Sequence, residues 1–266
     1  MLASRLPALF ISHGAPLFAL EPGKTGPALT RWGQQLADAN TLRGVVIMSP
    51  HWMEATPAVM TNAAPQTWHD FGGFPQALYA LQYPAAGCPA LAQEVIDLLA
   101  AAGIDAQGDA SRPFDHGAWV PLMHLFPHAN VPVVQVALPG GWGPARVLAM
   151  GRALRSLRDS GVLVIGSGSM THNLSEFFGA AREPAPYVLA FSRWVEAAVA
   201  RGDVSALLDY RAQAPDARRA HPSEDHFLPL FFALGAGDDD AAPDYLSREV
   251  MYGILAMDTF SLPAVR

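Results

Sequence analysis

The chain has 266 residues, of which 51% are hydrophobic and 15% are charged, and its formal net charge is −7. This length and apolar content suffice for one well-packed globular core. Lys24 is its one lysine and the arginines are scattered, which excludes the clustered positive charge that nucleic acids or anionic membrane surfaces require. The low charge content is compatible with a homo-oligomer that buries part of the surface.

The cysteine content and the apolar segments limit the cellular context. Cys88 has no partner for an intrachain disulfide, and a single thiol excludes thiolate-rich zinc sites. The apolar stretch near the start is interrupted by Pro7 and His13, which indicates a first core strand and not a signal peptide. No apolar run approaches the roughly 18 residues of a membrane helix. We therefore expect a cytoplasmic protein that does not enter a membrane.

Predicted strands and helices alternate along the chain. In chain order they are a strand over Leu6–Ser12, a helix over Gly26–Asn40, a strand over Gly44–Pro50, helices over Pro89–Ala102 and Ala118–Phe126, a strand over Val131–Leu138, a helix over Pro144–Ser160, a strand over Gly161–Gly166, and helices over Pro186–Arg201 and Phe227–Leu234. The strands are short, β-branched-rich and apolar throughout, which is typical of a sheet covered on both faces. Several helices begin at proline or end before glycine.

This order of elements predicts an α/β fold with a mixed, largely parallel central sheet flanked by helices on both faces. No change in composition marks a linker and no repeat is evident. We therefore expect a single catalytic domain over residues 1–266. The acidic stretch Gly235–Asp244 is predicted to be a solvated loop.

Three histidines, His13, His51 and His172, each follow a predicted strand. In open α/β sheets, ligands bind beyond the carboxyl ends of the strands, so these side chains are expected to converge. Neutral imidazole is the commonest ligand of borderline divalent ions. The pattern predicts an Fe(II) or Zn(II) site, and Fe(II) is favoured if open coordination positions must take both a substrate and dioxygen.

Other residues stay open between functional and structural roles. His116 begins a predicted helix, and His221 and His226 lie in the segment HPSEDH ahead of another. His69 could line a pocket mouth, although a structural hydrogen bond is as common for such a residue. Trp52 could wall an aromatic pocket, although core packing is the usual role of tryptophan.

Five motifs in order resemble a known family. They are SHGAP around His13, SPHW around His51, DHGAW around His116, GSGSMTHNL around His172 and HPSEDHFLPL around His221 and His226. The chain resembles the class III extradiol ring-cleavage dioxygenases, in the branch of DOPA 4,5-dioxygenase-like enzymes, from residue 12 to about residue 230. The resemblance implies an α/β fold and an enzyme that opens a catechol, DOPA or a related one, with O2 to give a muconic semialdehyde.

The resemblance also implies a metal site. His13 and His51 match metal ligands, and the third ligand comes from the HPSEDH segment. His226 is favoured there, with His221 and Glu224 as alternatives. The implied cofactor for activity is Fe(II), while Zn(II) is expected to compete for the same site because it binds such ligands more tightly.

Two histidines match catalytic residues of the family. His172 is implied as the general base that takes a catechol proton, and His116 as a second catalytic histidine that contacts substrate or oxygen. The candidates for the substrate pocket are Trp52, His69, Asn173 and His221. A zinc-dependent hydrolase or lyase with the same histidines, or a non-catalytic metal-binding homologue, are the alternatives to a dioxygenase.

Overall fold

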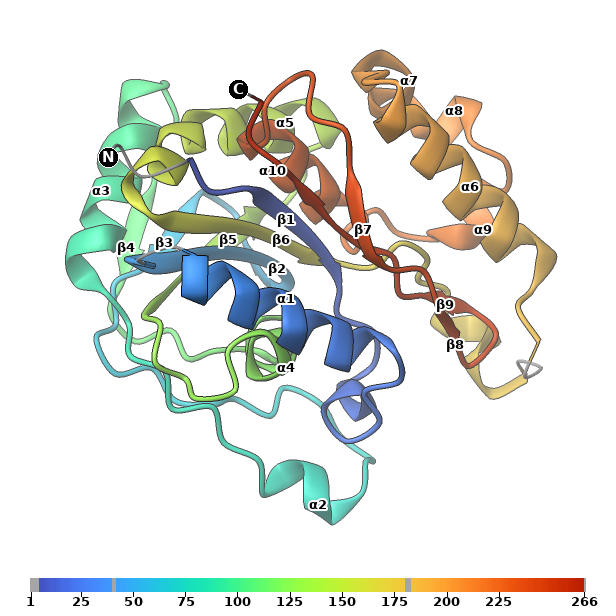
Figure 1. The fold of residues 1–266 in the computed structure, drawn as a ribbon, viewed down its shortest axis with the longest axis horizontal. Coiled ribbons are helices and arrows are strands. Elements are labelled where there is room, and N and C mark those ends of the chain that lie inside the picture. The colour runs from blue at the N-terminus through green and yellow to red at the C-terminus, as the bar shows by residue number, and fades with distance from the viewer. Residues whose placement is uncertain (1–4, 40–41, 180–182, 266) are drawn as a thin grey trace.

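One eight-stranded sheet forms the centre of the protein (Figure 1), in the order β4-β3-β5-β2-β6-β1-β10-β7. The computed structural model describes residues 5–39, 42–179 and 183–265. The strands of this sheet are β1 Ala8–Ser12, β2 Gly44–Glu54, β3 Ala58–Met60, β4 Gln107–Asp109, β5 Val133–Pro139, β6 Val162–Gly168, β7 Asp244–Ser247 and β10 Thr259–Leu262. A separate antiparallel ribbon joins β8 Val250–Met251 to β9 Leu255–Ala256.

The central strands β5, β2, β6 and β1 are parallel neighbours and are buried along almost their whole length. Because parallel strands point the same way, their carboxyl ends meet at one edge of the sheet. Antiparallel strands flank this core: β3 pairs with β5, and β10 joins β1 to β7. The predicted mixed, largely parallel sheet is thus confirmed. The outer strands escaped prediction because they are only three or four residues long.

Helices cover both faces of the sheet. They are η1 Pro16–Ala19, α1 Thr25–Ala39, α2 Gln76–Tyr79, α3 Pro89–Ala101, α4 His116–Leu125, α5 Pro144–Ala153, η2 Arg155–Ser160, η3 Leu174–Gly179, α6 Pro186–Ala200, α7 Val204–Leu208, α8 Tyr210–Gln213, α9 Ala217–Ala220 and α10 Leu228–Ala236. Helices α1 and α4 lie on one face, and α3, α5 and α10 lie on the other (Figure 1).

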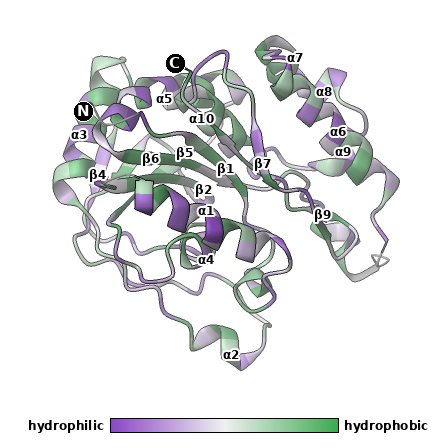
Figure 2. Ribbon diagram, viewed as in Figure 1, coloured by the Kyte–Doolittle hydropathy of each residue, from purple (hydrophilic) through white to green (hydrophobic). Residues whose placement is uncertain are grey.

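Strand β2 shows how the sheet builds two hydrophobic cores. Val45 and Ile47 pack in the core under α1 and α4, whereas Val46 and Met48 pack in the core under α3, α5 and α10. Successive residues of a strand point to opposite faces, so an unbroken apolar run serves both cores. Figure 2 shows the corresponding hydrophobic colour along the central strands and α10, whereas α1 carries hydrophilic residues.

Several predicted boundaries differ from the structure. The helix expected over Gly26–Asn40 is α1, and Asn40 lies outside the described residues. The helix expected over Pro144–Ser160 ends at Ala153 and continues as the 3-10 helix η2. In the stretch Gly235–Asp244, predicted as a loop, the first two residues belong to α10 and Asp244 begins β7. Within the described ranges, no helix combines the length and apolar character that a membrane crossing needs.

Candidate metal centre and active site

Histidines from separate elements meet at the carboxyl edge of the parallel strands. His13 directly follows β1, and its backbone N–H donates to the carbonyl of Gly168 at the end of β6 (2.9 Å). His51 lies within β2, which continues to Glu54, and was predicted to follow a strand ending at Pro50. The register between β2 and β5 shifts just there, and such an irregularity re-aims a strand side chain.

Two more histidines reach the same edge from helix starts. His116 is the first residue of α4, and His226 lies in the turn before α10. The carbonyl of His226 accepts a hydrogen bond from the N–H of Ser169 (2.8 Å). A Cβ atom at Gly168 would collide with that carbonyl oxygen, so glycine at this position lets the His226 turn approach the end of β6.

The Nε2 atom of His51 lies close to that of His13 and to that of His226. The Nε2 atom of His51 is 3.2 Å from that of His13 and 3.3 Å from that of His226. The rings of His13 and His226 are 5.5 Å apart between centroids. The fold therefore places near one another the three residues that the resemblance implied as metal ligands.

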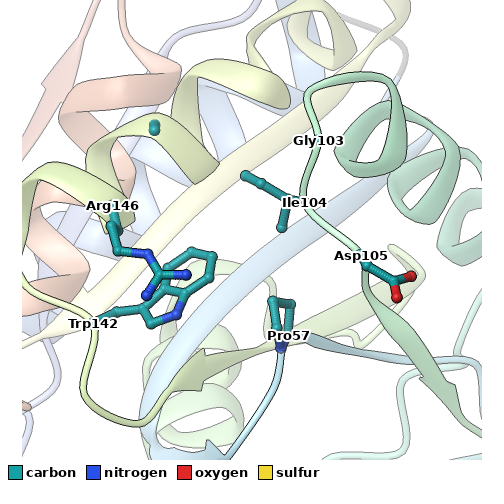
Figure 3. A pocket seen from close by; sticks show the side chains of 7 residues that line it. Pro57, Gly103, Ile104, Asp105, Trp142 and Arg146 are labelled. Carbon is teal, nitrogen blue, oxygen red and sulfur yellow. The ribbon is translucent and has the colours of Figure 1, made fainter.

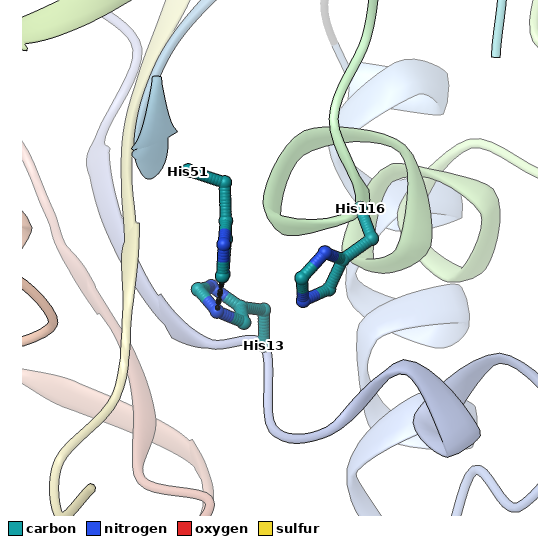
Figure 4. A group of neighbouring side chains, drawn as sticks. All are labelled: His13, His51 and His116. Atoms are coloured by element: carbon teal, nitrogen blue, oxygen red, sulfur yellow. Dashed lines mark hydrogen bonds between the residues drawn. The ribbon is translucent and has the colours of Figure 1, made fainter. Parts of the chain in front are cut away.

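His116 stands beside this group, as Figure 4 shows. Its ring centroid is 3.9 Å from that of His51, and one ring nitrogen each of His13, His51 and His116 lie within 4.8 Å of one another. A second triad, with His116 in place of His226, could therefore also hold an ion. The two sets share His13 and His51 and differ in the third ligand, which is His226, with its Nε2 atom 3.3 Å from that of His51, or His116.

Outer hydrogen bonds determine which ring nitrogens face the centre. The hydroxyl of Ser167 donates to the carbonyl of Gly117, so it accepts the Nδ1 proton of His13 (3.0 Å). His226 donates its Nδ1 proton to Asp225. In both imidazoles the Nε2 lone pair is therefore free to act as a ligand, the usual arrangement of metal-binding histidines.

The donor set fits a divalent metal ion. Two unprotonated nitrogens that face each other repel unless a proton or a cation lies between them. Two nitrogens bound to one ion at about 2.1 Å, at octahedral to tetrahedral angles, lie roughly 3.0–3.4 Å apart. The spacings of 3.2 Å from His51 to His13 and 3.3 Å from His51 to His226 agree with that range.

Burial keeps these imidazoles neutral. Desolvation, aided by the neighbouring histidines, lowers the pKa of His51 to about 4 and the pKa of His13 and His226 well below the ordinary value. At neutral pH all three are uncharged. Their lone pairs are thus available to a metal ion without loss of a proton.

Asp70 is a site residue that the sequence analysis missed. One carboxylate oxygen accepts hydrogen bonds from the backbone N–H and the Nδ1 of His116, both at 2.9 Å, and the other lies 3.8 Å from the Nδ1 of His51. Burial acts to raise the pKa of Asp70, but its hydrogen bonds and charge interaction with His116 outweigh this and lower the pKa. Nothing in the sequence signals the pair, because 46 residues separate its members.

A buried polar network lies behind His51 and was also missed. Asp115 accepts hydrogen bonds from Ser49 (2.8 Å), Arg112 (2.8 Å) and Gln135. The hydroxyl of Ser49 accepts the N–H of His51, and Arg112 donates to the His51 carbonyl, both at 3.2 Å. The backbone of His51 is therefore held on both sides.

His172 lies against the group as a stacked ring. Its centroid is 3.5 Å from that of His226, with 5° between the ring planes. Burial is the largest influence on the pKa of His172 and lowers it to about 4, against the opposing charge of Asp225. The ring is neutral at pH 7 and can accept a proton.

A cavity of about 610 Å³ opens over the histidines. Its lining includes His51, His116, His172 and His226 together with the apolar side chains Leu17, Phe71, Phe74, Leu174, Phe177 and Leu255. Such a mostly apolar cavity with a few convergent polar groups is typical of a small-molecule site.

Trp52 and His69, two predicted pocket candidates, do not line this cavity. Trp52 is 1% exposed, donates to Glu54 (3.1 Å) and packs in the core. The Nε2 of His69 donates to the carbonyl of Leu81 (3.1 Å). In the structure, tertiary packing gives these two side chains the structural roles that aromatic residues usually have.

Asn173 and His221 also lie outside the cavity lining. The amide of Asn173 donates to Glu176 and to the carbonyl of Arg219. His221 is fully buried and donates from Nε2 to the carbonyl of Met170 (2.9 Å), so it bonds to protein. The alternative ligand Glu224 accepts from Tyr210 and Arg211, which leaves His226 as the residue of the HPSEDH segment at the centre.

A second pocket, of about 290 Å³, contains none of the clustered histidines (Figure 3). Its lining residues are Pro57, Gly103, Ile104, Asp105, Trp142, Arg146 and Ala149. The guanidinium of Arg146 lies 4.0 Å from the ring centroid of Trp142, so a cation–π contact already engages its charge. We assign no ligand to this pocket.

Fold and site together define a class of protein: an α/β protein whose parallel strands end in a histidine cluster able to hold a metal ion beneath an apolar cavity. The family described as the catalytic LigB subunit of aromatic ring-opening dioxygenase matches residues 7–258. The chain belongs to this family and is an enzyme of the ring-opening dioxygenase class. The resemblance inferred from the five motifs is thus confirmed.

Two curated relatives are named as extradiol dioxygenases, and a solved structure shares the fold. The chain is 35% identical over 253 residues to 4,5-DOPA dioxygenase extradiol of Beta vulgaris, which covers 94% of each chain. It is 36% identical over 242 residues to the protein of the same name from Escherichia coli (strain K12), which covers 90% of this chain and 88% of that one. The crystal structure of an uncharacterized protein from Escherichia coli K12 matches with a TM-score of 0.80 and 27% identity, over 97% of this chain and 100% of that one.

Proposed function

We propose that this enzyme is an extradiol dioxygenase, acting as one catalytic domain, that cleaves the ring of DOPA or a related catechol with O2 to give a muconic semialdehyde. The observation that carries the proposal is the close approach of the Nε2 atom of His51 to those of His13 and His226, beneath a cavity large enough for a substituted catechol. The names of the relatives support a catechol substrate.

The proposed cofactor is Fe(II), held by His13, His51 and His226. When bound, the iron supplies a Lewis acid that stabilises a catecholate and open coordination positions for substrate and dioxygen. The neutral imidazole donors support this choice but suit Zn(II) equally, and Zn(II) binds such ligands more tightly. Iron loading is therefore part of the test.

His172 is proposed as the general base. It is neutral, lines the cavity and stacks on His226, so it can accept a proton from a catechol hydroxyl at the cavity base. The negative charge of a catecholate beside it raises its pKa and stabilises the protonated ring. The same proton can later be donated from His172 to a leaving oxygen.

His116 is proposed as the second catalytic histidine. The carboxylate of Asp70 accepts its Nδ1 proton, which holds the ring with Nε2 toward the cavity. From this position the Nε2 side of His116 can form a hydrogen bond with a substrate or dioxygen oxygen at the cavity base.

The proposal is tested by loading the full chain with Fe(II) under anaerobic conditions and then mixing it with O2 and a panel of catechols. We expect O2 uptake equal to catechol consumed, and a product that contains both oxygen atoms, seen by mass spectrometry with labelled O2. His172→Ala should retain iron and lose turnover. Catechol conversion that needs zinc and consumes no O2 would instead identify a hydrolase or lyase, and an iron-loaded protein inert toward every catechol would point to a non-catalytic homologue.

A further inference from the structure

We propose that this active site is built for a catechol whose ring substituent is uncharged and apolar, and not for an amino-acid catechol such as DOPA. The inference rests on the catechol-cleaving function proposed above and narrows its substrate class. It comes from the outer part of the cavity, which receives whatever the ring carries once its hydroxyls face the histidines.

One wall of this outer part is aromatic and continues from the site itself. The ring of Phe71 contacts that of His116 edge-on, with 5.6 Å between centroids, and Phe74 contacts Phe71 in the same way at 5.4 Å. Both phenyl rings line the cavity. A substituent that leaves the catechol ring on this side therefore lies along hydrocarbon.

The rest of the lining comes from other segments and is also apolar. Leu174 and Phe177 belong to η3, which begins two residues after His172, and both line the cavity. Leu17 of η1 and Leu255 of β9 also belong to the lining. The substituent of a bound catechol is therefore surrounded mainly by apolar side chains of the cavity lining.

The cavity has room for a substituent in addition to the catechol ring. Gly72 and Gly73 lie between the two phenylalanines in the cavity lining, and a Cβ atom added at either would meet nothing within 4 Å. The cavity of about 610 Å³ therefore accommodates a chain of several carbons as well as the ring.

Charged partners for a carboxylate are missing from the described part of the lining. There, the ionisable side chains are the four histidines at the base, and no lysine or arginine is among them. Asp70 and Asp225, the carboxylates behind His116 and His226, are engaged by those imidazoles. Transferring a substrate carboxylate from water into such surroundings is unfavourable unless a partner compensates it.

Hydrocarbon gains affinity in the same place. Each methylene buried in the cavity raises affinity by about fourfold. Burial of methylenes favours an alkyl chain, whereas loss of water disfavours a chain that ends in a carboxylate. The lining therefore distinguishes two substrates of nearly equal length and shape by their charge.

The experiment uses the Fe(II)-loaded full chain and matched catechols. We expect kcat/KM to rise from 4-methylcatechol through 4-ethylcatechol to 4-propylcatechol by about fourfold per methylene. We expect 4-propylcatechol to exceed both 3,4-dihydroxyphenylpropionate and DOPA by at least roughly tenfold. Equal or higher kcat/KM for either acid would overturn the inference.

Anaerobic calorimetric titration of the iron-loaded protein with the same compounds provides a readout apart from turnover. Tighter binding of 4-propylcatechol, with a negative heat-capacity change, is expected. Binding with this preference but no ring opening of any catechol would reject the proposed function alone. Ring opening with the acids preferred would reject the apolar-substituent inference alone.

A variant tests the wall directly. Leu174 is 54% exposed at the mouth, so Leu174→Arg can place a guanidinium there without a buried charge. This change should raise kcat/KM for 3,4-dihydroxyphenylpropionate relative to 4-propylcatechol by at least roughly tenfold. The neutral Leu174→Gln is the matched control and should produce no such reversal. An unchanged ratio in Leu174→Arg would show that the substituent does not lie at this wall.

Discussion

Three imidazoles at the site are each oriented by a hydrogen-bond partner on the Nδ1 atom. Ser167 holds His13, Asp225 holds His226 and Asp70 holds His116. Such outer hydrogen bonds select the tautomer and the ring orientation, and their loss typically costs 10–100-fold in metal affinity or activity. Substituting these partners one at a time can therefore distinguish a histidine that binds the metal from one that acts in catalysis.

The first prediction concerns the proposed ligands. His13→Ala and His51→Ala should each abolish retention of iron, because the remaining nitrogens cannot hold the ion in competition with water and buffer. Elemental analysis of the purified variants measures this. His128→Ala, at an exposed histidine, is the matched control and should keep its metal. Full metal content in either of the first two variants would disprove the ligand assignment.

The second prediction decides between His226 and His116 as the third ligand. Asp225→Asn should weaken metal affinity by roughly 10–100-fold because the amide no longer accepts the Nδ1 proton as strongly, whereas Asp70→Asn should lower kcat with a much smaller change in metal affinity. Competition with a chelator measures affinity in both variants. The reverse pattern would assign the third position to His116.

At the scale of elements, the start of α4 is packed directly on β2. Asp115 caps the helix by accepting the N–H of Ala118 (3.2 Å) and also accepts the hydroxyl of Ser49 on β2. A Cβ atom at Gly117 would lie 2.8 Å from the Cδ2 of His51 and closer still to the Ser49 hydroxyl. The position of α4 thus sets the positions of His51 and His116 together.

The third prediction follows from this contact. Gly117→Ala should push α4 from β2, cost about 1–3 kcal/mol of unfolding free energy and weaken metal binding through displacement of His51. Denaturant titration and chelator competition measure the two effects. Gly140→Ala is the control, because a Cβ there has only one neighbour, at 3.5 Å. Unaltered metal affinity in Gly117→Ala would show that the two elements move independently.

At the scale of the whole molecule, buried neutral histidines make folding sensitive to acid. Burial lowers the pKa of His221 to about 3 and that of His51 and His172 to about 4. In the unfolded chain these groups titrate near 6.5, so below that pH the unfolded state binds protons that the folded state does not. Above pH 6.5 these groups are neutral in both states and do not change the unfolding free energy. Below that pH the unfolding free energy falls as the pH is lowered toward their folded-state pKa values. Asp258 acts in the opposite direction, because burial raises its pKa to about 7.

The fourth prediction isolates His221, which lies outside the metal cluster and is fully buried. Between pH 6.5 and 5, the unfolding free energy of metal-free His221→Gln should fall by about 2 kcal/mol less than that of the unaltered protein. The glutamine can retain the hydrogen bond to Met170, which limits other effects. Urea titrations at both pH values give the comparison. Parallel curves would mean that His221 is already charged in the folded state.

Much of the site was readable from local sequence. His13 and His172 follow strands of continuous apolar residues, and the ends of parallel strands share one edge, so the chain itself indicates that these imidazoles converge. His226 was found through the motif around it. None of the four pocket candidates lines the cavity over the histidines, because nothing local distinguishes a tryptophan or histidine that lines a cavity from one that packs in the core.

The amino-acid sequence by itself determined the parallel α/β core, the edge at which the histidines meet and the family, because apolar periodicity and motif order are properties of short segments. Only the tertiary structure decided which partners orient the imidazoles and which side chains wall the cavity. Asp70 and His116 are 46 residues apart, and Phe71 and Leu174 lie on different segments of the lining. Their proximity depends on how loops fold back over the sheet edge, and loop conformation follows from packing and not from local sequence.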